Sequence, residues 1–286
     1  MSRTVLNISI RADLTARQLD WFAPDCHPFV ATRQSATRLG DEVGATTMAV
    51  SAEVRDTFEL YRLGPDRQIV GLSEDAFLRL RPTTRARLVR EQVHWGRGNV
   101  PTVRSVPQQV RPLVQGQADG HRFVWWRRLM QGNALQVLDA YLADGRRPSL
   151  HGDVPPEHWH QVARIVPGAQ RLAGRYPDRS GPNCFGAVMA ACGVEGAEQE
   201  WVMREPFDAW LTKHTRRGGS DDGAGTVLVW RAPDGQADHA AVTIGGGWLL
   251  HKPSQGWMSP WKILTVAGGK SSARARGRRL TRHQLG

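Results

Sequence analysis

Three residues of this chain have the types and the spacing required for thiol-based acyl transfer. Cys184 follows a Gly-Pro-Asn turn and opens a run of small residues that predicts a helix. His239 and His251 lie downstream, twelve residues apart, on either side of three consecutive glycines. A helix N-terminus favours a thiolate and can stabilise the oxyanion of a tetrahedral intermediate. We therefore interpret Cys184 as a nucleophile, His239 as its base and His251 as the residue that orients His239.

Each of these residues also has a plainer interpretation. A free cysteine is often a small buried hydrophobe, and an isolated histidine is often a surface residue. The same three residues could hold zinc, but no CxxC or HxxxH spacing accompanies them and a further ligand or water would be needed. We expect no metal and no cofactor. Cys192 is expected in the core, Cys26 in a loop, and Asp238 and Lys252 as solvated charges beside the histidines.

The elements that must position these residues are short. Strands are predicted at 225–231, 240–244 and 247–251, and a Gly-Gly turn between the last two would make the histidines near neighbours. The cysteine helix is expected to end near residue 192, with a glycine cap at 193. The other predicted elements are helices at 15–22, 73–80, 82–94, 122–143, 156–166 and 205–211, a hairpin formed by 57–63 and 68–72, and a strand within 257–266.

Length and composition bound the class of protein. The chain has 286 residues, 40% of them hydrophobic, which is enough for one large domain or two ordinary ones. Three cysteines do not make a disulfide framework. No apolar run approaches the roughly 18 residues of a membrane span, and we recognise no secretory signal at the N-terminus. These features predict a cytoplasmic location and no membrane partner.

The positive charge is concentrated in part at the C-terminal end. The net charge is +11, and residues 270–286 hold six Lys or Arg and no Asp or Glu. A segment of this kind is typical of a solvated, flexible tail, and it can also contact nucleic acid or an acidic partner. The remaining positive charge is interspersed with acidic residues, and no common nucleic-acid-binding motif is present. Nucleic acid is therefore not an expected partner, and the oligomeric state is left open.

The segment from about 174 to 256 resembles the NlpC/P60 superfamily of papain-like cysteine peptidases. Residues 225–229, Gly-Thr-Val-Leu-Val, are similar to the Gly-Asp-Leu-Val strand of that family. Residues 239–251 resemble its His-x-Gly-Ile-x-x-Gly-x-Gly-x-x-x-His element, with the offset between the histidines intact. The resemblance implies a compact α+β fold in which the nucleophile helix packs on an antiparallel sheet that carries both histidines. It implies the same roles for Cys184, His239 and His251, and it makes Tyr176 a contributor to the oxyanion site.

The chain departs from the family around the nucleophile. Asn183 replaces the usual Asp, Phe185 replaces the usual Ser, and the segment from Tyr176 to Cys184 is shorter than usual. We place Asn183, Phe185 and Tyr176 on the oxyanion and substrate-binding side of the site, together with Trp257 from a tryptophan-rich segment. The N-terminal half resembles no family that we recognise.

The sequence thus predicts an α+β protein in three parts: an N-terminal α+β accessory region (1–120), a papain-like NlpC/P60-type thiol domain (121–268) and a flexible basic tail (269–286). The expected function is cysteine-dependent acyl transfer through an acyl-thioester intermediate, as a peptidase, an amidase or an amide-forming acyltransferase. The expected substrate is a peptide or a small amide, ester or thioester, free or bound to a carrier. The alternative is a catalytically inert binding protein whose basic tail contacts nucleic acid or an acidic partner.

Overall fold

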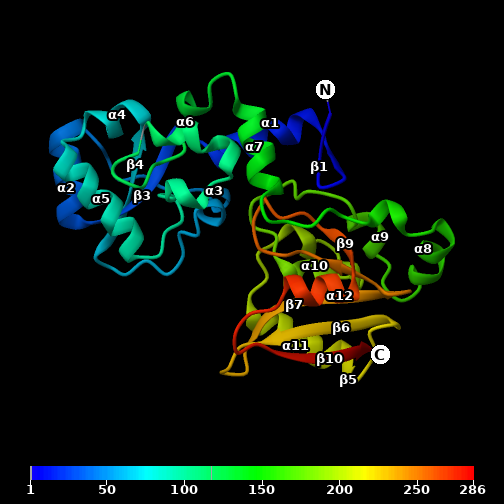
Figure 1. Ribbon diagram of the computed structural model, residues 1–286. Helices are drawn as coiled ribbons and strands as arrows, with labels where there is room; N and C mark the ends of the chain where they lie inside the picture. The colour runs from blue at the N-terminus through cyan, green and yellow to red at the C-terminus, as the bar shows by residue number, and fades with distance from the viewer. Residues whose placement is uncertain (1, 117) are drawn as a thin grey trace. The chain divides into compact units, whose positions relative to one another are not determined.

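The computed structural model describes residues 2–116 and 118–286, and it is a mixture of helices and antiparallel sheets (Figure 1). The chain divides into two units. Residues 13–145 form one, here called the insert unit, and residues 1–12 and 146–286 form the other, here called the sheet unit. The predicted α+β class is confirmed. The boundaries of the units, at residues 12 and 145, differ from those expected at 120 and 268.

The insert unit is built around a two-stranded antiparallel sheet. β3 (Cys26–Thr32) pairs with β4 (Arg67–Ser73), and α2 (Arg33–Val43), α4 (Glu74–Arg79) and α5 (Pro82–His94) contact these strands. Ser73 caps α4, as predicted, by accepting a hydrogen bond from the Ala76 N–H. The other α-helices described in this unit are α1 (Ala12–Phe22), α3 (Ala52–Thr57), α6 (Arg111–Gln115) and α7 (Ala134–Ala143).

Two local predictions for this unit are wrong. Residues 68–72 do form a strand, but β4 pairs with the distant β3, and residues 57–63 form no strand: Thr57 ends α3 and the rest are turn and loop. β3 has a run of five buried residues at 27–31, and its pairing with β4 satisfies backbone groups that lie in the interior. The helix predicted at 122–143 is limited to α7 and a preceding 3-10 turn, η3 (Arg128–Met130).

The sheet unit contains a six-stranded antiparallel sheet with the strand order β5-β10-β6-β7-β8-β9. The strands are β5 (Thr215–Arg217), β6 (Ala224–Arg231), β7 (Ala237–Gly245), β8 (Trp248–His251), β9 (Lys262–Thr265) and β10 (Arg279–Leu285). A small hairpin of β1 (Arg3–Val5) and β2 (Ile8–Ile10) joins this unit through a hydrogen bond from the Asn7 side chain to the Ser149 carbonyl, 3.2 Å long. The strands predicted around the two histidines are confirmed.

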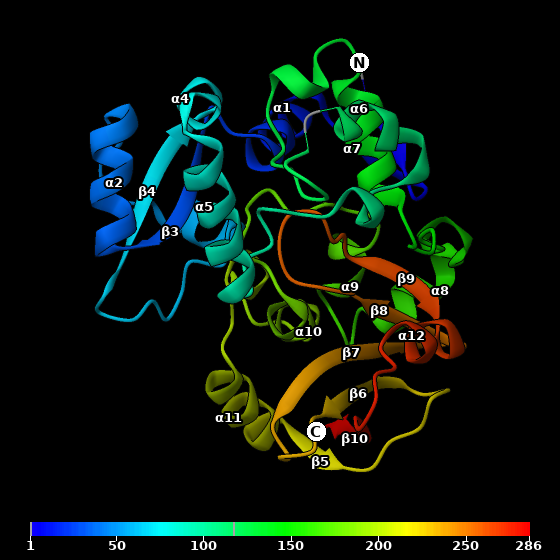
Figure 2. The same cartoon turned by 60° about the vertical axis from the view of Figure 1, so that its left-hand side comes forward.

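Helices cover both faces of this sheet. Along β7, Ala240 and Val242 share a core with α10 (Cys184–Ala191), whereas Ala241 belongs to a second cluster with Val266, the first residue of α12 (Val266–Ser272). This division follows from the alternation of side chains along a strand. α10 lies against β7 with α11 (Arg204–His214) beside it (Figure 2). The shorter helices α8 (Pro156–Val162) and α9 (Ala169–Leu172) complete the core on the α10 face.

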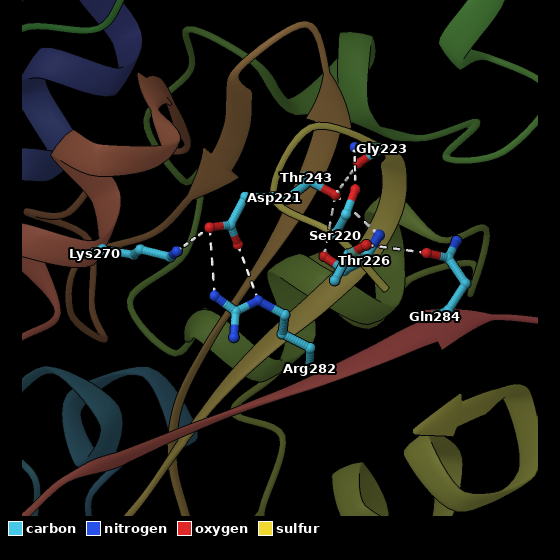
Figure 3. A network of polar contacts seen from close by, with 8 residues as sticks. All are labelled: Ser220, Asp221, Gly223, Thr226, Thr243, Lys270, Arg282 and Gln284. Atoms are coloured by element: carbon cyan, nitrogen blue, oxygen red, sulfur yellow. Dashed lines mark hydrogen bonds and ion pairs between the residues drawn. The ribbon is translucent and has the colours of Figure 1, made fainter. Parts of the chain in front are cut away.

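The C-terminal segment that was expected to be a flexible tail is part of the sheet. β10 lies between β5 and β6 and pairs with both. The charges of the C-terminal segment are partly balanced. Lys270 and Arg282 both bind the Asp221 carboxylate (Figure 3), and Arg278 binds Asp238. The prediction of a mobile tail is therefore wrong. The basic composition suggested a tail, whereas the segment contains a strand whose backbone is paired on both sides.

None of the helices in the two described ranges combines the length and the apolar character that a membrane crossing requires.

Candidate active site

The candidate nucleophile opens a capped helix. Cys184 is the first residue of α10, and Asn183 is the N-cap. The Asn183 side-chain oxygen accepts a hydrogen bond from the Gly186 N–H (3.0 Å), and its amide donates to the Val202 carbonyl (2.7 Å). The cap satisfies an N–H group that a helix start would otherwise leave unpaired. Both ends of the Asn183 side chain are thus engaged by backbone, which differs from the predicted substrate-binding role.

Two other residues expected at a substrate cleft lie in the interior. Phe185 is buried and stacks on Phe207, with ring centroids 4.4 Å apart. Trp257 is also buried, with 2% of its surface exposed. The usual fate of large aromatic side chains, core packing, accounts for both positions.

A tight hairpin sets the two histidines against each other. Gly246 and Gly247 form the two-residue turn between β7 and β8, and their φ values of 59° and 79° favour glycine at both positions. His251 pairs with Ala241 across the hairpin. The Nε2 atoms of His239 and His251 share a hydrogen bond of 2.7 Å, and the two rings meet edge to face. The proximity predicted from the twelve-residue offset is confirmed.

The Cys184 sulfur lies beside the backbone of β7. β8 ends at His251, opposite Ala241, and the N–H of Ala240 is directed at the sulfur. The N–H groups of Cys184 and Phe185 act on the sulfur as well, and all three backbone donors lower the pKa of the thiol. Such a cluster of donors stabilises negative charge.

The thiol is related to the histidine pair through the backbone of β7 and not by a direct hydrogen bond. Ala240, whose N–H faces the sulfur, immediately follows His239. Opposite this point the pairing of β6 and β7 shifts register, an irregularity that commonly redirects side chains near active sites. Within the described residues, no hydrogen bond joins the Cys184 sulfur to the His239 ring. A direct transfer of the thiol proton to this ring would require such a bond to form.

Burial controls the protonation of all three groups. It raises the pKa of the Cys184 thiol to about 11, although the Ala240 N–H and the Lys252 charge lower it. Burial lowers the pKa of His239 to about 4, and the nearby Arg278 charge lowers it further. It also lowers the pKa of His251 well below its usual range. The resting site at neutral pH thus holds a neutral thiol and neutral imidazoles. The sequence predicted a thiolate favoured by the helix N-terminus, but desolvation of the sulfur outweighs that effect.

Lys252 is a site residue that the sequence analysis missed. It was expected to be solvated, yet it is 0% exposed. Its Nζ donates hydrogen bonds to the carbonyls of Gly256 (2.9 Å) and Ser259 (2.5 Å) and lies 5.9 Å from the centre of the Trp261 ring. The one sequence signal that could have found it is its position directly after His251. Lysines at strand ends normally extend into water, so the position after His251 did not by itself indicate a buried lysine.

Asp238 also differs from the expectation of a solvated charge. It forms ion pairs with Arg204 (3.5 Å) and Arg278 (2.5 Å). Its charge raises the pKa of His239, against the larger opposite effects of burial and of Arg278. Asp238 is therefore part of an ion-pair cluster at the start of β7.

Tyr176 is buried, with 4% of its surface exposed, and its hydroxyl has no hydrogen-bond partner among the described residues. Burial raises the pKa of this hydroxyl above its usual range, while the charges of Arg146 and Arg3 lower it. No hydrogen bond between the described residues joins this hydroxyl to Cys184. The oxyanion role of Tyr176 therefore stays a prediction.

The two remaining cysteines are free thiols. Cys192 follows the end of α10, packs against the core as predicted and has a pKa raised to about 12 by burial. Cys26 is exposed at the start of β3 rather than in a loop, and burial of part of it raises its pKa. Neither lies within the constellation around Cys184.

No group of three or more His, Cys, Asp or Glu side chains in the described part of the chain is arranged to hold a metal ion. Comparisons of the chain with protein-family models, with curated proteins and with solved structures gave no match. The function is therefore argued from the chemistry of the site itself.

Proposed function

We propose that the sheet unit is a cysteine-dependent acyl-transfer enzyme of the papain-like NlpC/P60 type. Cys184 is the nucleophile, His239 the general base and His251 the residue that orients His239. One observation carries the proposal: the thiol at the start of α10 faces the N–H that follows His239, and the His239 ring is bonded to His251. A nucleophile, a base and an orienting partner are the parts that such chemistry needs.

The neutral resting state sets the direction of proton transfer. In the productive tautomer, His239 donates its Nε2–H to His251 Nε2, which leaves His239 Nδ1 free to accept the thiol proton. The Cys184 sulfur then attacks an amide, ester or thioester carbonyl. The new C–S bond forms as the carbonyl π electrons move to oxygen. Backbone N–H groups at the helix start hold this oxyanion.

The second half of the reaction returns the enzyme to its starting state. Collapse of the tetrahedral intermediate breaks the bond to the leaving group, which takes the proton from His239, and a thioester on Cys184 remains. Water or an amine, deprotonated by His239, attacks this thioester and expels the sulfur as a thiolate, which takes the proton back from His239. Water gives a free acid and makes the protein a hydrolase, whereas an amine gives a new amide and makes it an acyltransferase.

The test is the direct detection of an acyl-enzyme. Full-length protein is mixed with p-nitrophenyl acetate, quenched in acid and examined by peptide mass spectrometry. We expect one acetyl group on Cys184, no adduct in Cys184→Ala, and acylation slower by about 100-fold or more in His239→Ala, the usual contribution of a general base. Cys192→Ala is the matched control, because Cys192 lies at the other end of the same helix, and it should react as the native protein does.

The fate of the acyl group then separates the two reaction types. Glycine ethyl ester is added at increasing concentration, and the yields of acetylated amine and of acetate are compared. The enzyme assignment would be contradicted if Cys184→Ala were still acetylated, or if His239→Ala were acetylated at the native rate.

A further inference from the structure

We propose that a hollow beside α12 is a binding site for a small molecule that carries a phosphate group and an apolar or aromatic part. The hollow lies in the sheet unit and has a volume of about 470 Å³. It is lined by residues of α12, of the segment that follows α12, and of strands β6 and β10. Its volume is within the range of small-molecule sites. The proposal goes beyond the proposed function and does not depend on the reactivity of Cys184.

The first observation is that polar side chains gather on the wall that α12 forms. Ala267, Lys270 and Ser271 occupy positions i, i+3 and i+4, which place them on one face of the helix. Arg274 extends this wall beyond the helix, where its N–H donates to the Ser271 carbonyl (3.3 Å). One side of the hollow therefore carries an ammonium, a hydroxyl and a guanidinium, which are all donors that can bind phosphate oxygens.

The second observation is an excess of positive charge around the hollow. Lys270 and Arg282 share the single carboxylate of Asp221 (Figure 3), so this cluster keeps one positive charge. Arg278, which lines the hollow, shares the carboxylate of Asp238 with another arginine in the same way. No acidic side chain is among the described residues that line the hollow. An anion that enters it therefore meets positive charge that the surrounding carboxylates do not neutralise.

The third observation is that guanidinium donors remain for a ligand. Arg278 is held by two hydrogen bonds, from its Nε to Asp238 (2.5 Å) and from its Nη1 to the Ala273 carbonyl (3.0 Å). These bonds use two of its five N–H donors. Arg274 is exposed, and in the described part of the chain no side chain or carbonyl binds its guanidinium. A guanidinium can bind two oxygens of one phosphate, which favours phosphate as the anion.

The floor of the hollow is apolar. Trp230 of β6 and Leu280 of β10 are opposite each other in the sheet, and both line the hollow. An aromatic and an aliphatic side chain next to cations suit a molecule that is apolar at one end and anionic at the other. The ring of Trp230 also contacts that of His239, with centroids 5.4 Å apart. One side chain thus separates the hollow from the histidine pair.

The arrangement of the cations favours a small molecule over a polymer. Nucleic acid is bound by basic residues that follow the polymer backbone along a groove. Here Lys270, Arg274 and Arg278 surround one hollow, whereas Arg276 and Arg279 of the same segment do not line it. The proposal therefore assigns part of the basic composition of residues 270–286 to a single binding site.

The experiment is a titration of the full-length protein with phenyl phosphate, which joins a phosphate to a flat apolar ring. Binding is followed by saturation-transfer difference NMR of the phenyl protons at low ionic strength. We expect saturable binding that added NaCl weakens, because the cations of the hollow are partly exposed to solvent. Inorganic phosphate and phenol should displace phenyl phosphate only at higher concentrations, since each supplies one of the two kinds of contact.

Arg274→Gln tests the site with little risk to the fold, because the side chain is exposed. We expect the dissociation constant for phenyl phosphate to rise about 10-fold, the usual loss for one charge-assisted hydrogen bond. Arg276→Gln is the matched control. It removes the same charge from an exposed position that does not line the hollow, and it should bind phenyl phosphate as the native protein does. Ala275→Glu places a carboxylate at an exposed position of the lining and should weaken binding more than Arg274→Gln.

Three results would overturn the proposal. The first is no saturable binding of phenyl phosphate at millimolar concentrations. The second is an equal loss of affinity in Arg274→Gln and Arg276→Gln. The third is a short single-stranded DNA that binds more tightly than phenyl phosphate and loses affinity equally in both variants, because that result would indicate diffuse charge in place of a site.

Discussion

At the scale of single residues, burial keeps the thiol and the two imidazoles of the candidate site in their neutral forms. Burial raises the pKa of Cys184 to about 11 and lowers that of His239 to about 4. In the proposed reaction, the thiol proton would therefore move to His239 as the C–S bond forms. Burial also lowers the pKa of the neighbouring Lys252 well below its usual range. Such a site resembles a hydroxyl nucleophile with a base more than a preformed thiolate–imidazolium pair.

The buried neutral histidines couple stability to pH. His27 in the insert unit and His239 in the sheet unit both have a pKa lowered by burial from 6.5 to about 4. Between these values the unfolded chain binds more protons than the folded one, so the free energy of unfolding rises with pH. Stability is complete above about 6.5 and is lost as the pH falls towards 4. Each histidine accounts for roughly 2–3 kcal/mol between pH 7.5 and 4.5.

Urea unfolding at several pH values measures this loss. His27→Gln should flatten the pH dependence of the insert unit, and His239→Gln that of the sheet unit. Identical slopes in the native protein and in both variants would exclude the assigned protonation states.

The sequence was informative about residues whose partners are local. The histidine pair could be predicted because a glycine turn between two strands brings positions 239 and 251 together without help from the rest of the fold. The burial of Lys252 could not be predicted, because its ligands are backbone carbonyls, which every residue possesses. The roles expected of Asn183 and Phe185 failed to appear for a related reason: caps and core positions use the same residue types as binding sites.

At the scale of elements, the position of the nucleophile depends on how closely α10 approaches its neighbours. A Cβ added at Gly186 would lie 2.2 Å from the Ala197 carbonyl oxygen, closer than atoms can approach. Because the obstacle is backbone, α10 or the turn at Ala197 must move. We expect Gly186→Ala to destabilise the sheet unit by about 1–3 kcal/mol and to slow acylation of Cys184.

Chemical denaturation and the acylation assay test this expectation together. Gly152→Ala is the control, because no atom lies within 4 Å of the added Cβ, and it should change stability by no more than about 0.5 kcal/mol. Equal behaviour of the two variants would show that α10 tolerates a wider spacing.

The elements that could be predicted are those with local signals. Ser73 and Pro82 mark the starts of α4 and α5, and both helices lie where these residues indicate. The hairpin expected at 57–72 failed because a strand pattern states which face is buried but not which strand is the partner. β4 pairs with β3, about forty residues earlier, to bury a longer apolar run.

At the scale of the whole molecule, the C-terminal segment is structural. We expect removal of residues 279–286 to destabilise the sheet unit severely, because it leaves β6 and β5 without their shared neighbour and Asp221 without Arg282. Thermal unfolding of the truncated protein measures the effect. Arg279→Gln removes a charge from an exposed position of β10 and should melt as the native protein does. If the truncated protein had native stability, the expectation of a flexible tail would be correct after all.

This result changes how the binding-protein alternative has to be tested. Deletion of the basic segment would damage the fold and weaken any binding indirectly. Arg274→Gln and Arg276→Gln, both at exposed positions, reduce the charge without removing the strand. Composition alone could not distinguish these cases, because a strand rich in arginine and a disordered basic tail have similar residue counts.

The glycine turn between β7 and β8 also has a consequence in time. It joins strands that are contiguous in the chain, and isolated hairpins form within about 1–10 microseconds, whereas Cys184 lies 55 residues before His239. On a ribosome the thiol emerges well before the strands that will enclose it, and it stays open to oxidants and electrophiles during that interval. The two imidazoles then come together almost at once. In the proposed enzyme, Cys184 can pair with His239 only after α10 has packed against β7.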